Sequence, residues 1–488
     1  MSSSAASLRS GLTIALGRAA RLAARLRGGG SGGTALPGLV MEKTDPGFLR
    51  RTLDQLPLGV VVVSGTNGKT TTTKMVVELL TAQGLKVLTN RTGSNFVRGV
   101  LASLLTEVDA VGRLDADVAV LELDEAHAVR FVRRVRPRAA LLLNVMRDQL
   151  DRFGEIDYTA SLLHKVAAAT TDVVVVNADD PRLSGPAFFE GVRARTAAFG
   201  AGPGLRSLFV SDDDLRTGAT QAEADRTEKP EAGRAGQTGQ SGPGRSTTSD
   251  AAPAAPETAP EASTPPAPAP RVSLQSLSGQ DAVVRVDGAD HDIAFAIPGI
   301  HNQLNACAAL AVALETLGDE ADLAGLLTTL ASVQAAFGRG EVLTLDSRDV
   351  QLSLVKNPAG FRMGLLTAAE AVRSGGPESV MIAINDEYAD GRDMSWLWDV
   401  EFAGLRTEGV AVVTGVRAWD MALRLRYDEV PIGTVEPDLT RAVALLRRAA
   451  SAADDGAGRP MRIFTTYTAM LALRAHLAEL TDVEEALT

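Results

Sequence analysis

The sequence predicts an α/β protein built on parallel sheets that are covered on both faces by helices. Short runs of β-branched residues alternate with helical stretches, which is the pattern of a doubly wound parallel sheet. These runs are apolar throughout, as strands buried on both faces should be. A length of 488 residues favours two or three domains.

The first α/β unit is expected to begin near Phe48. A strand at Val60–Ser64 leads into a glycine turn and a helix over about 70–83. Further apolar runs predict strands at 118–123, 139–144 and 172–177. Helical stretches separate these runs, so we expect the strands to be parallel.

A second group of elements follows a long irregular stretch. A hairpin is expected to turn at Asp287-Gly288, between strands at 283–286 and 293–297, before a helix over 302–317. The last third repeats the strand–helix alternation, with strands expected at 350–355, 380–384, 409–414 and 461–465.

Residues 201–271 break the pattern with Gly, Pro, Ala, Ser, Thr and charged residues, and they end in Ala-Pro repeats. Such a composition cannot bury enough apolar surface to offset the entropy of ordering, so we expect a disordered low-complexity insert. The predicted domains are a basic N-terminal helix and linker at 1–47, a central domain at 48–338 that holds the insert, and a C-terminal α/β domain at 339–488.

The composition excludes several classes of function. The net charge is −11 and no basic block occurs, which argues against a nucleic-acid partner. A single cysteine, Cys307, excludes an intramolecular disulfide and any metal centre made of several cysteines, and it fits a reducing cytoplasm.

The first 40 residues are basic, since five arginines precede Glu42, the first acidic residue: Arg9, Arg18, Arg21, Arg25 and Arg27. Three interpretations stay open: a mitochondrial transit peptide, an amphipathic helix over about 12–26 lying on protein or on anionic lipid, and a solvated basic face. No apolar run is long enough to predict a membrane span.

The strongest local signal is GTNGKTTT at 65–72, which follows a strand and opens a helix as a P-loop does. Glycines let backbone N–H groups converge on phosphate oxygens, and the helix N-terminus adds partial positive charge. Lys69 is expected to reach the outer phosphates, and the Thr70 hydroxyl to bind Mg²⁺. Val63 stands where the general pattern has its first glycine, so this is a shortened variant. The predicted ATP-binding residues of this loop are Thr66, Asn67, Gly68, Lys69, Thr70 and Thr71.

Carboxylates follow the next strands along the chain. Glu122 ends the run at 118–123, where it is expected to hold a magnesium ion already bound to phosphates. The alternative is a solvated carboxylate at a strand end. The segment DQLDR at 148–152 follows the next strand and could add a second carboxylate to the same edge.

Taken together, these segments resemble the Mur ligases. The motifs that carry the resemblance, in the family's order, are GTNGKTT at 65–71, Leu121-Glu122-Leu123, Asn144 with DQLDR at 148–152, Gly299 with His301-Asn302 and Asn305, and Gly338-Arg339-Gly340-Glu341. The resemblance implies a parallel-sheet ATPase domain and a C-terminal Rossmann-like domain. It also implies that Asn302 and Arg339 hold the nucleotide.

Within that family the sequence is similar to the MurT branch of lipid II isoglutaminyl synthases, through KNPAG at 356–360, the segment 386–399 and DQLDRFGEI at 148–156. Gln149 and Lys356-Asn357-Pro358 depart from the peptide-forming Mur ligases. The resemblance implies bacterial, cytoplasmic amidation of the α-carboxylate of D-glutamate in lipid II, driven by ATP and Mg²⁺ through an acyl phosphate. Some members of this branch carry a four-cysteine zinc ribbon. The insert has no cysteine, so zinc is not expected here.

The resemblance also implies a GatD-like glutaminase partner in a heterodimer. Cys307 lies among small apolar residues, so we interpret it as a packed thiol rather than a glutaminase nucleophile. In the resembling family the aspartate at the position of Asp393 completes the partner's Cys-His pair. A loop or helix-cap carboxylate is the alternative, and Asp390 and Asp399 compete for the role.

Two rival functions remain open. The first is a free-standing ligase that adds an amino acid, as folylpolyglutamate synthetase does, and Gln149 and Lys356-Asn357-Pro358 argue against it. The second is a non-enzymatic scaffold that binds nucleotide without turnover. Trp396 and Trp398 flank the Asp393 motif and could anchor an interface or pack in a core.

Overall fold

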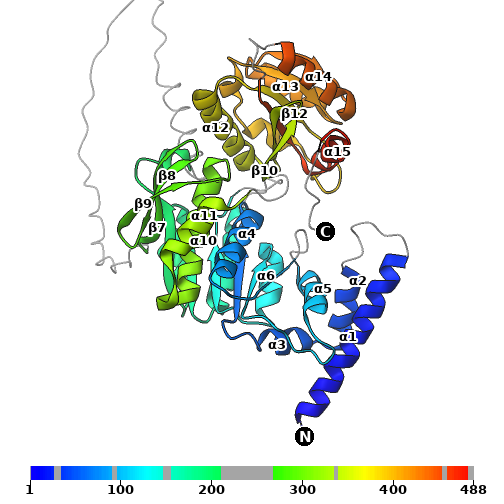
Figure 1. Cartoon of the computed structure of the whole chain (residues 1–488), viewed down its shortest axis with the longest axis vertical. Coiled ribbons are helices and arrows are strands. Elements are labelled where there is room, and N and C mark those ends of the chain that lie inside the picture. Colours follow the sequence, from blue (N-terminus) through cyan, green and yellow to red (C-terminus); the bar gives the residue numbers. More distant parts are fainter. Residues whose placement is uncertain are drawn as a thin grey trace, which may run out of the picture.

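The computed structural model describes residues 2–26, 35–90, 96–146, 155–209, 268–334, 339–452 and 459–481. It contains two α/β units, one above the other in Figure 1. The elements of the first unit are α1 (Ser2–Leu26), α2 (Ala35–Thr44), α3 (Phe48–Leu53), β1 (Val60–Ser64), α4 (Lys69–Ala82), β2 (Val87–Thr89), α5 (Val97–Glu107), β3 (Val118–Glu122), α6 (Glu125–Val132), β4 (Ala139–Leu142), α7 (Glu155–Ala169), β5 (Val173–Asn177), α8 (Pro181–Ser184), β6 (Arg195–Ala201), β7 (Pro270–Ser278), β8 (Asp281–Val286), β9 (Ala289–Ala294), α10 (Ile300–Leu317) and α11 (Leu323–Ser332).

The first sheet has the strand order β2-β3-β1-β4-β5-β6-β7-β8-β9. The strands from β2 to β7 run parallel, and β8 and β9 add an antiparallel edge. Val61 pairs with Val120 on one side and Ala139 on the other, so β1 is central. The loop after β1 therefore leaves the middle of the sheet at its carboxyl edge, which is where open α/β sheets bind ligands.

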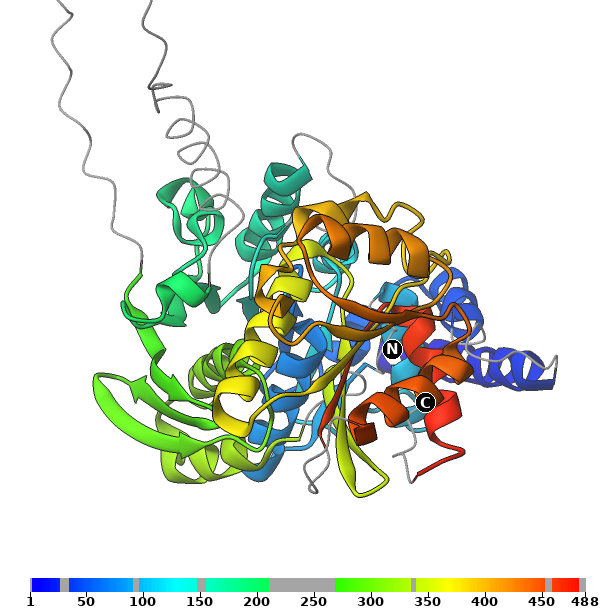
Figure 2. The same cartoon turned by 90° about the horizontal axis from the view of Figure 1, so that it is seen from above.

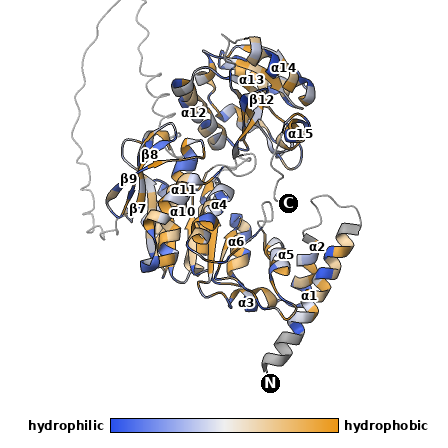
Figure 3. Cartoon of the chain, viewed as in Figure 1, coloured by the Kyte–Doolittle hydropathy of each residue, from blue (hydrophilic) through white to orange (hydrophobic). Residues whose placement is uncertain are grey.

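Helices cover both faces of this sheet, which explains why its central strands β1, β3, β4 and β5 are almost entirely apolar. Helices α4, α10 and α11 pack on one face, where Met75 and Leu310 are fully buried. Helices α3, α5, α6 and α7 pack on the other, with Phe48 and Phe131 in the core. In Figure 3 the central strands of this sheet carry mostly the hydrophobic colour.

The second unit is a smaller sheet with the strand order β10-β11-β15-β12-β13-β14, parallel except for β10. Helices α12 and α13 cover one face, and α14 and α15 cover the other. The two sheets share no strand, and we propose the domain boundary between residues 338 and 339. The elements of the second unit are β10 (Arg339–Leu345), β11 (Arg348–Leu354), α12 (Pro358–Gly375), β12 (Ser379–Ala383), η5 (Ser395–Asp399), β13 (Val410–Thr414), α13 (Ala418–Tyr427), β14 (Ile432–Val435), α14 (Leu439–Ala452), β15 (Met461–Thr465) and α15 (Tyr467–Leu477).

The hairpin corrects one predicted strand. We expected its second strand at 293–297, but β9 spans Ala289–Ala294. Asp287 and Gly288 both have positive φ, as a two-residue hairpin turn requires. That turn places Val286 opposite Ala289, so the return strand starts directly after the turn.

The edges of the predicted insert also differ from expectation. Ala201 ends β6 and pairs with Leu274, and β7 begins at Pro270, so both ends of the 201–271 stretch belong to the sheet. Pairing with a neighbouring strand satisfies backbone groups in a way that composition does not reveal. Residues 210–267 lie outside the described residues. The stretch expected as linker within 1–47 likewise contains a helix, α2, which contacts α1 and α5.

Candidate active site

The loop between β1 and α4 is a tight turn that only glycine permits at two positions. Gly65 and Gly68 have φ of 134° and 85°. A Cβ on Gly68 would lie 2.6 Å from Oδ1 of Asn305 on α10. The first N–H groups of α4 have no acceptor within the helix, and with the helix dipole they form an anion-binding site at this loop.

Asn144, just beyond β4, fixes the shape of this loop. Its Oδ1 accepts from the Asn67 backbone N–H at 2.9 Å, and its Nδ2 donates to the Asn67 carbonyl at 3.1 Å. The Thr66 N–H donates to the Asn144 carbonyl at 3.1 Å, and the Thr66 hydroxyl accepts from the Met146 N–H at 3.0 Å. The conformation of this loop is therefore fixed by hydrogen bonds to the segment that follows β4.

Lys69 is buried beneath the loop. Its Nζ donates to the Gly65 carbonyl at 2.6 Å and lies 3.2 Å from a carboxylate oxygen of Asp124. Burial is the largest influence and lowers the pKa of the ammonium, but the nearby carboxylates of Glu125, Asp124 and Glu122 together raise the pKa above its usual value. The lysine is thus held as a fixed positive charge at the loop.

Thr70 and Glu122 meet at the edge of the sheet. The Thr70 hydroxyl donates to Oε1 of Glu122 at 2.9 Å, and Glu122 is 8% exposed. Asn90, just after β2, holds Glu122 in place by exchanging two hydrogen bonds of 2.9 Å with its backbone N–H and carbonyl. The sequence predicted the Thr70–Glu122 pair but not the Asn90 support.

This pair of oxygen donors fits Mg²⁺. Magnesium prefers oxygen ligands and is usually held by one or two carboxylates together with phosphates and water. Across the described part of the chain, no group of three or more His, Cys, Asp or Glu side chains could form an all-protein metal centre. Thr70 and Glu122 would therefore hold the ion jointly with the nucleotide.

The start of α10 lies beside the loop, because Asn305 touches Gly68. Asn302 is one turn earlier on the same helix, and its Nδ2 donates to the Pro298 carbonyl at 2.6 Å. Its Oδ1 is buried and has no hydrogen-bond partner among the described residues. This buried Oδ1 is suited to accept a hydrogen bond from the amino group of a nucleotide base bound beside the loop. Arg339 begins β10 next to a register shift, and its side chain lies outside the described atoms.

The C-terminal unit reaches the phosphate loop through Lys356 and Asn357. The side chains of Asn67 and Asn357 exchange two hydrogen bonds, of 3.2 and 3.0 Å. Lys356 Nζ donates to the Thr66 carbonyl at 3.4 Å. Asn357 is fully buried, and its Oδ1 also accepts from the Gly360 N–H at 2.8 Å, which caps α12. The sequence identified Lys356-Asn357-Pro358 as a departure from the peptide-forming Mur ligases, but it did not predict the contact of this segment with the loop between β1 and α4.

Two aspartates of the 386–399 segment, Asp390 and Asp393, have different surroundings. Asp390 is buried and structural, since its Oδ1 accepts from the Thr468 N–H at 2.7 Å and its Oδ2 from the Glu387 N–H at 3.1 Å. Asp393 is exposed, and its Oδ1 accepts from the Ser395 N–H at 2.9 Å. Hydrogen bonds from Ser395, first from its backbone, hold the pKa of Asp393 below its usual value. Asp393 therefore presents a charged carboxylate to the outside.

The tryptophans beside this segment take different roles. Trp396 is 3% exposed and packs against Phe361 in the core. Trp398 is 50% exposed and lies edge-on to Tyr427 of α13, with ring centroids 5.1 Å apart. Trp398 is thus the tryptophan of this segment that is available to a partner.

Two further predicted features have different outcomes. Cys307 is buried within α10, and burial raises the pKa of its thiol to about 12, so the interpretation as a packed thiol is confirmed. The DQLDR segment at 148–152 lies outside the described residues.

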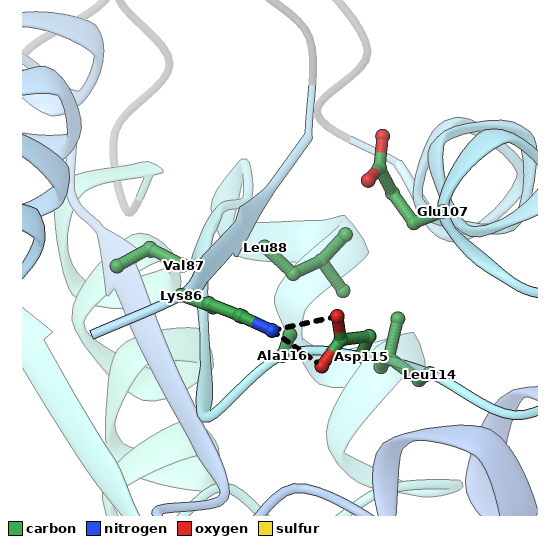
Figure 4. A pocket seen from close by; sticks show the side chains of 7 residues that line it. All are labelled: Lys86, Val87, Leu88, Glu107, Leu114, Asp115 and Ala116. Carbon is green, nitrogen blue, oxygen red and sulfur yellow. Dashed lines mark hydrogen bonds and ion pairs between the residues drawn. The ribbon is translucent and has the colours of Figure 1, made fainter. Parts of the chain in front are cut away.

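A surface hollow elsewhere does not compete with this site. It has a volume of ≈ 230 Å³ and is lined by Lys86, Val87, Leu88, Glu107, Leu114, Asp115 and Ala116. Lys86 precedes β2 and Ala116 precedes β3, so the hollow lies at the amino ends of these strands, opposite to the P-loop. Figure 4 shows Lys86 directed at Asp115 across it, 2.7 Å apart. Ligands of such sheets bind at the carboxyl ends, so we assign no role to it.

Comparison with known proteins agrees with this geometry. The sequence model of the Mur ligase middle domain matches residues 63–222, which include the phosphate loop, Glu122 and Asn144. The model of the MurT ligase C-terminal domain matches residues 354–470, which include Asn357 and Asp393. Two Mur ligase domain models thus match this chain, one on each side of the proposed domain boundary. The predicted resemblance and fold class are therefore confirmed.

Two curated proteins are similar to this chain over nearly its whole length. It is 27% identical over 441 residues to the MurT subunit of lipid II isoglutaminyl synthase (glutamine-hydrolyzing) of Staphylococcus aureus strain COL, covering 90% of this chain and 92% of that protein. It is 29% identical over 449 residues to the subunit of the same name from Streptococcus pneumoniae, covering 91% and 92%.

Solved structures share the fold at low sequence identity. MurF from Acinetobacter baumannii has a TM-score of 0.62 and 18% identity, covering 91% of this chain and 81% of that one. Folylpolyglutamate synthase from Mycobacterium tuberculosis, complexed with ADP and AMPPCP, has a TM-score of 0.55 and 16% identity, covering 90% and 96%. At these identities the likeness concerns the fold alone.

Proposed function

We propose that this chain amidates the α-carboxylate of D-glutamate in lipid II to give D-isoglutamine, using ATP, Mg²⁺ and ammonia from a GatD-like glutaminase. The observation that carries the ligase chemistry is the phosphate loop with Lys69 beneath it and the Thr70–Glu122 pair beside it. The choice of substrate is supported by full-length relatives named as lipid II isoglutaminyl synthase subunits. This substrate places the reaction in the bacterial cytoplasm, at the inner face of the membrane.

The reaction needs an activated carboxylate, because a carboxylate is a poor electrophile at neutral pH. A substrate carboxylate oxygen attacks the γ-phosphorus of ATP, ADP leaves, and an acyl phosphate forms. Ammonia then attacks the carbonyl carbon, the C–O bond to phosphate breaks, and inorganic phosphate leaves while the new amide loses a proton. Such transfers depend on positioning and on neutralising charge.

The residues of this chain would supply that positioning. The α4 N-terminus and the Lys69 ammonium would neutralise the phosphates, and Thr70 and Glu122 would orient Mg²⁺, which supplies further charge neutralisation when bound. Asn302 and Arg339 would hold the nucleotide. Asn357 would hold the C-terminal unit on the loop, because its amide pairs with Asn67.

A partner is required for ammonia. Glutamine hydrolysis needs a reactive cysteine, and the one cysteine of this sequence is buried in α10 with a raised pKa. Asp393 is exposed and ionised, as a carboxylate that orients a partner's imidazole must be. Trp398, five residues after Asp393, forms an exposed aromatic pair with Tyr427, and such pairs are typical of interface anchors.

The test is product analysis with the full chain, its glutaminase partner, lipid II, ATP and glutamine. An amide at the D-glutamate α-carboxyl is the expected product, and it appears with ammonium alone when the partner is left out. A product that carries an added amino acid would support a folylpolyglutamate-type ligase instead. Binding of ATP with no product under any condition would support a scaffold.

A further inference from the structure

Helix α1 has two different faces. The inner face packs on the fold: Ile14 is 1% exposed, and a Cβ on Gly17 would lie 2.9 Å from the Met41 side chain of α2. Gly17 is also close to Leu105 of α5, at 3.1 Å from the same Cβ position. The helix is therefore held firmly against the first unit, and its outer face is fixed in direction.

The outer face is apolar although it is exposed. Because an α-helix has 3.6 residues per turn, the residues of this outer face lie opposite to Ile14 and Gly17. Leu12, Leu16 and Leu22 are 58%, 41% and 60% exposed. The exposed residues that make up this face are Leu12, Ala15, Leu16, Ala19, Leu22 and Ala23. A folded protein seldom leaves such an apolar face in water unless it binds something.

Positive charge borders the outer face. Arg9 and Arg18 are exposed and lie at its two margins, and Arg18 also donates to the Val108 carbonyl at 3.1 Å. No acidic residue precedes Glu42, although the whole chain carries a net charge of −11. The helix is thus a local basic region on an acidic protein.

The position of α1 leaves this face accessible. Figure 1 shows α1 at the periphery of the first unit, on the side away from the second unit, and Figure 2 shows the blue N-terminal helices reaching one margin of the molecule. A flat surface can therefore approach the helix along its length.

We propose that the outer face of α1 lies in the plane of an anionic lipid bilayer, with its leucines in the boundary between headgroups and acyl chains and its arginines among the headgroups. An apolar stripe flanked by arginines is the pattern of helices that bind in this way. None of the described helices has the length and hydropathy to cross a bilayer. Pairing of two copies through this face would bring arginine margins together, which like-charge repulsion disfavours.

This inference deepens the proposed function, because a membrane-bound enzyme meets a lipid-linked substrate in two dimensions. It does not depend on that function, since vesicle binding is measured without substrate. The two proposals can therefore fail separately.

The test is co-sedimentation of the full-length protein with vesicles of phosphatidylglycerol mixed with phosphatidylcholine, and with vesicles of phosphatidylcholine alone. We expect binding to the anionic vesicles that weakens as salt rises. Replacing Leu12, Leu16 and Leu22 together with glutamine should abolish it, at roughly tenfold per leucine. Arg9→Gln should weaken binding roughly fivefold, the worth of one cation near an anionic surface.

The matched control is Leu423→Gln, which removes a leucine of similar exposure, 51%, from α13 in the other unit. It should leave vesicle binding unchanged. Circular dichroism and thermal unfolding show that each variant is folded. The proposal is overturned by failure to bind anionic vesicles, by equal binding to neutral ones, by insensitivity to the leucine substitutions, or by a dimer in light scattering that these substitutions dissociate.

Discussion

The amide pair between Asn67 and Asn357 joins the two units at the phosphate loop, so its removal should slow the chemical step. Asn67→Ala and Asn357→Ala each delete both interdomain hydrogen bonds, of 3.2 and 3.0 Å. A hydrogen bond contributes about 0.5–1.5 kcal/mol net, so the pair is worth roughly 1–3 kcal/mol. That corresponds to a fall of roughly 5- to 160-fold in rate if the contact persists in the transition state.

The assay is amide formation with saturating ATP and lipid II and with ammonium as nitrogen source, which removes the partner from the measurement. The double variant should be little slower than either single one, because both lose the same contact. If the effects of the two substitutions multiply in full, the pair does not form in the reacting complex and the reasoning is refuted.

A matched variant separates this contact from helix stability. Asn357 also caps α12 by accepting from the Gly360 N–H. Ser caps helices as well as Asn does and carries no charge into this buried position, so Asn357→Ser should keep the thermal stability of the parent while losing the amide that pairs with Asn67. Reduced activity with unchanged melting temperature is the expected result.

Three further predictions follow from single side chains. Glu122→Gln should lower the rate of ammonium-dependent amidation by roughly 10²–10³-fold, which is the loss typical of removing one preorganised electrostatic group. An unchanged rate with an unchanged Mg²⁺ dependence would contradict the metal-binding role assigned to Glu122. Asp393→Asn should abolish amidation with glutamine as nitrogen source but spare amidation with ammonium, whereas the control Asp399→Asn should leave both activities intact. Equal loss of both activities in Asp393→Asn would instead indicate that Asp393 acts within this chain. Burial raises the pKa of Asp180 to about 6 from 3.8, so the stability it contributes is fully present below about pH 4 and is lost as the pH rises through 6. Between these pH values, the free energy of urea unfolding of the wild type should therefore fall by roughly 2–3 kcal/mol relative to that of Asp180→Asn. If the two unfolding free energies change in parallel with pH, the raised pKa is refuted.

The sequence predicted the central strands because their physical cause is local. Val60–Ser64 and Val173–Asn177 are runs of valine, which only a strand buried on both faces requires. The edge elements lack that signature. β2 has three residues, and β14 contains a glycine and is half exposed, so pairing with a neighbour rather than composition makes them strands. The same reason explains why Pro270 appeared to belong to the insert.

A site residue could be predicted where a chemically suitable side chain stands at the end of a predicted strand or at the start of a predicted helix. Glu122 and Thr70 each follow from a strand end and a helix start at one edge of a parallel sheet, so their contact could be inferred. Asn90 and Asn357 could not, because a lone asparagine in a turn is common and its partner lies far along the chain. Likewise, the exposure of Asp393 and the burial of Asp390 depend on the fold of the loop and on α15.

The most direct test of the account is the ratio of ADP released to amide formed by the full complex supplied with lipid II, ATP and glutamine. We expect one ADP for each amide, and we expect Lys69→Ala to abolish both together, since this lysine provides the fixed charge at the phosphate loop. Amide formation without ATP cleavage, or ATP cleavage that does not track the amide, would contradict the central claim.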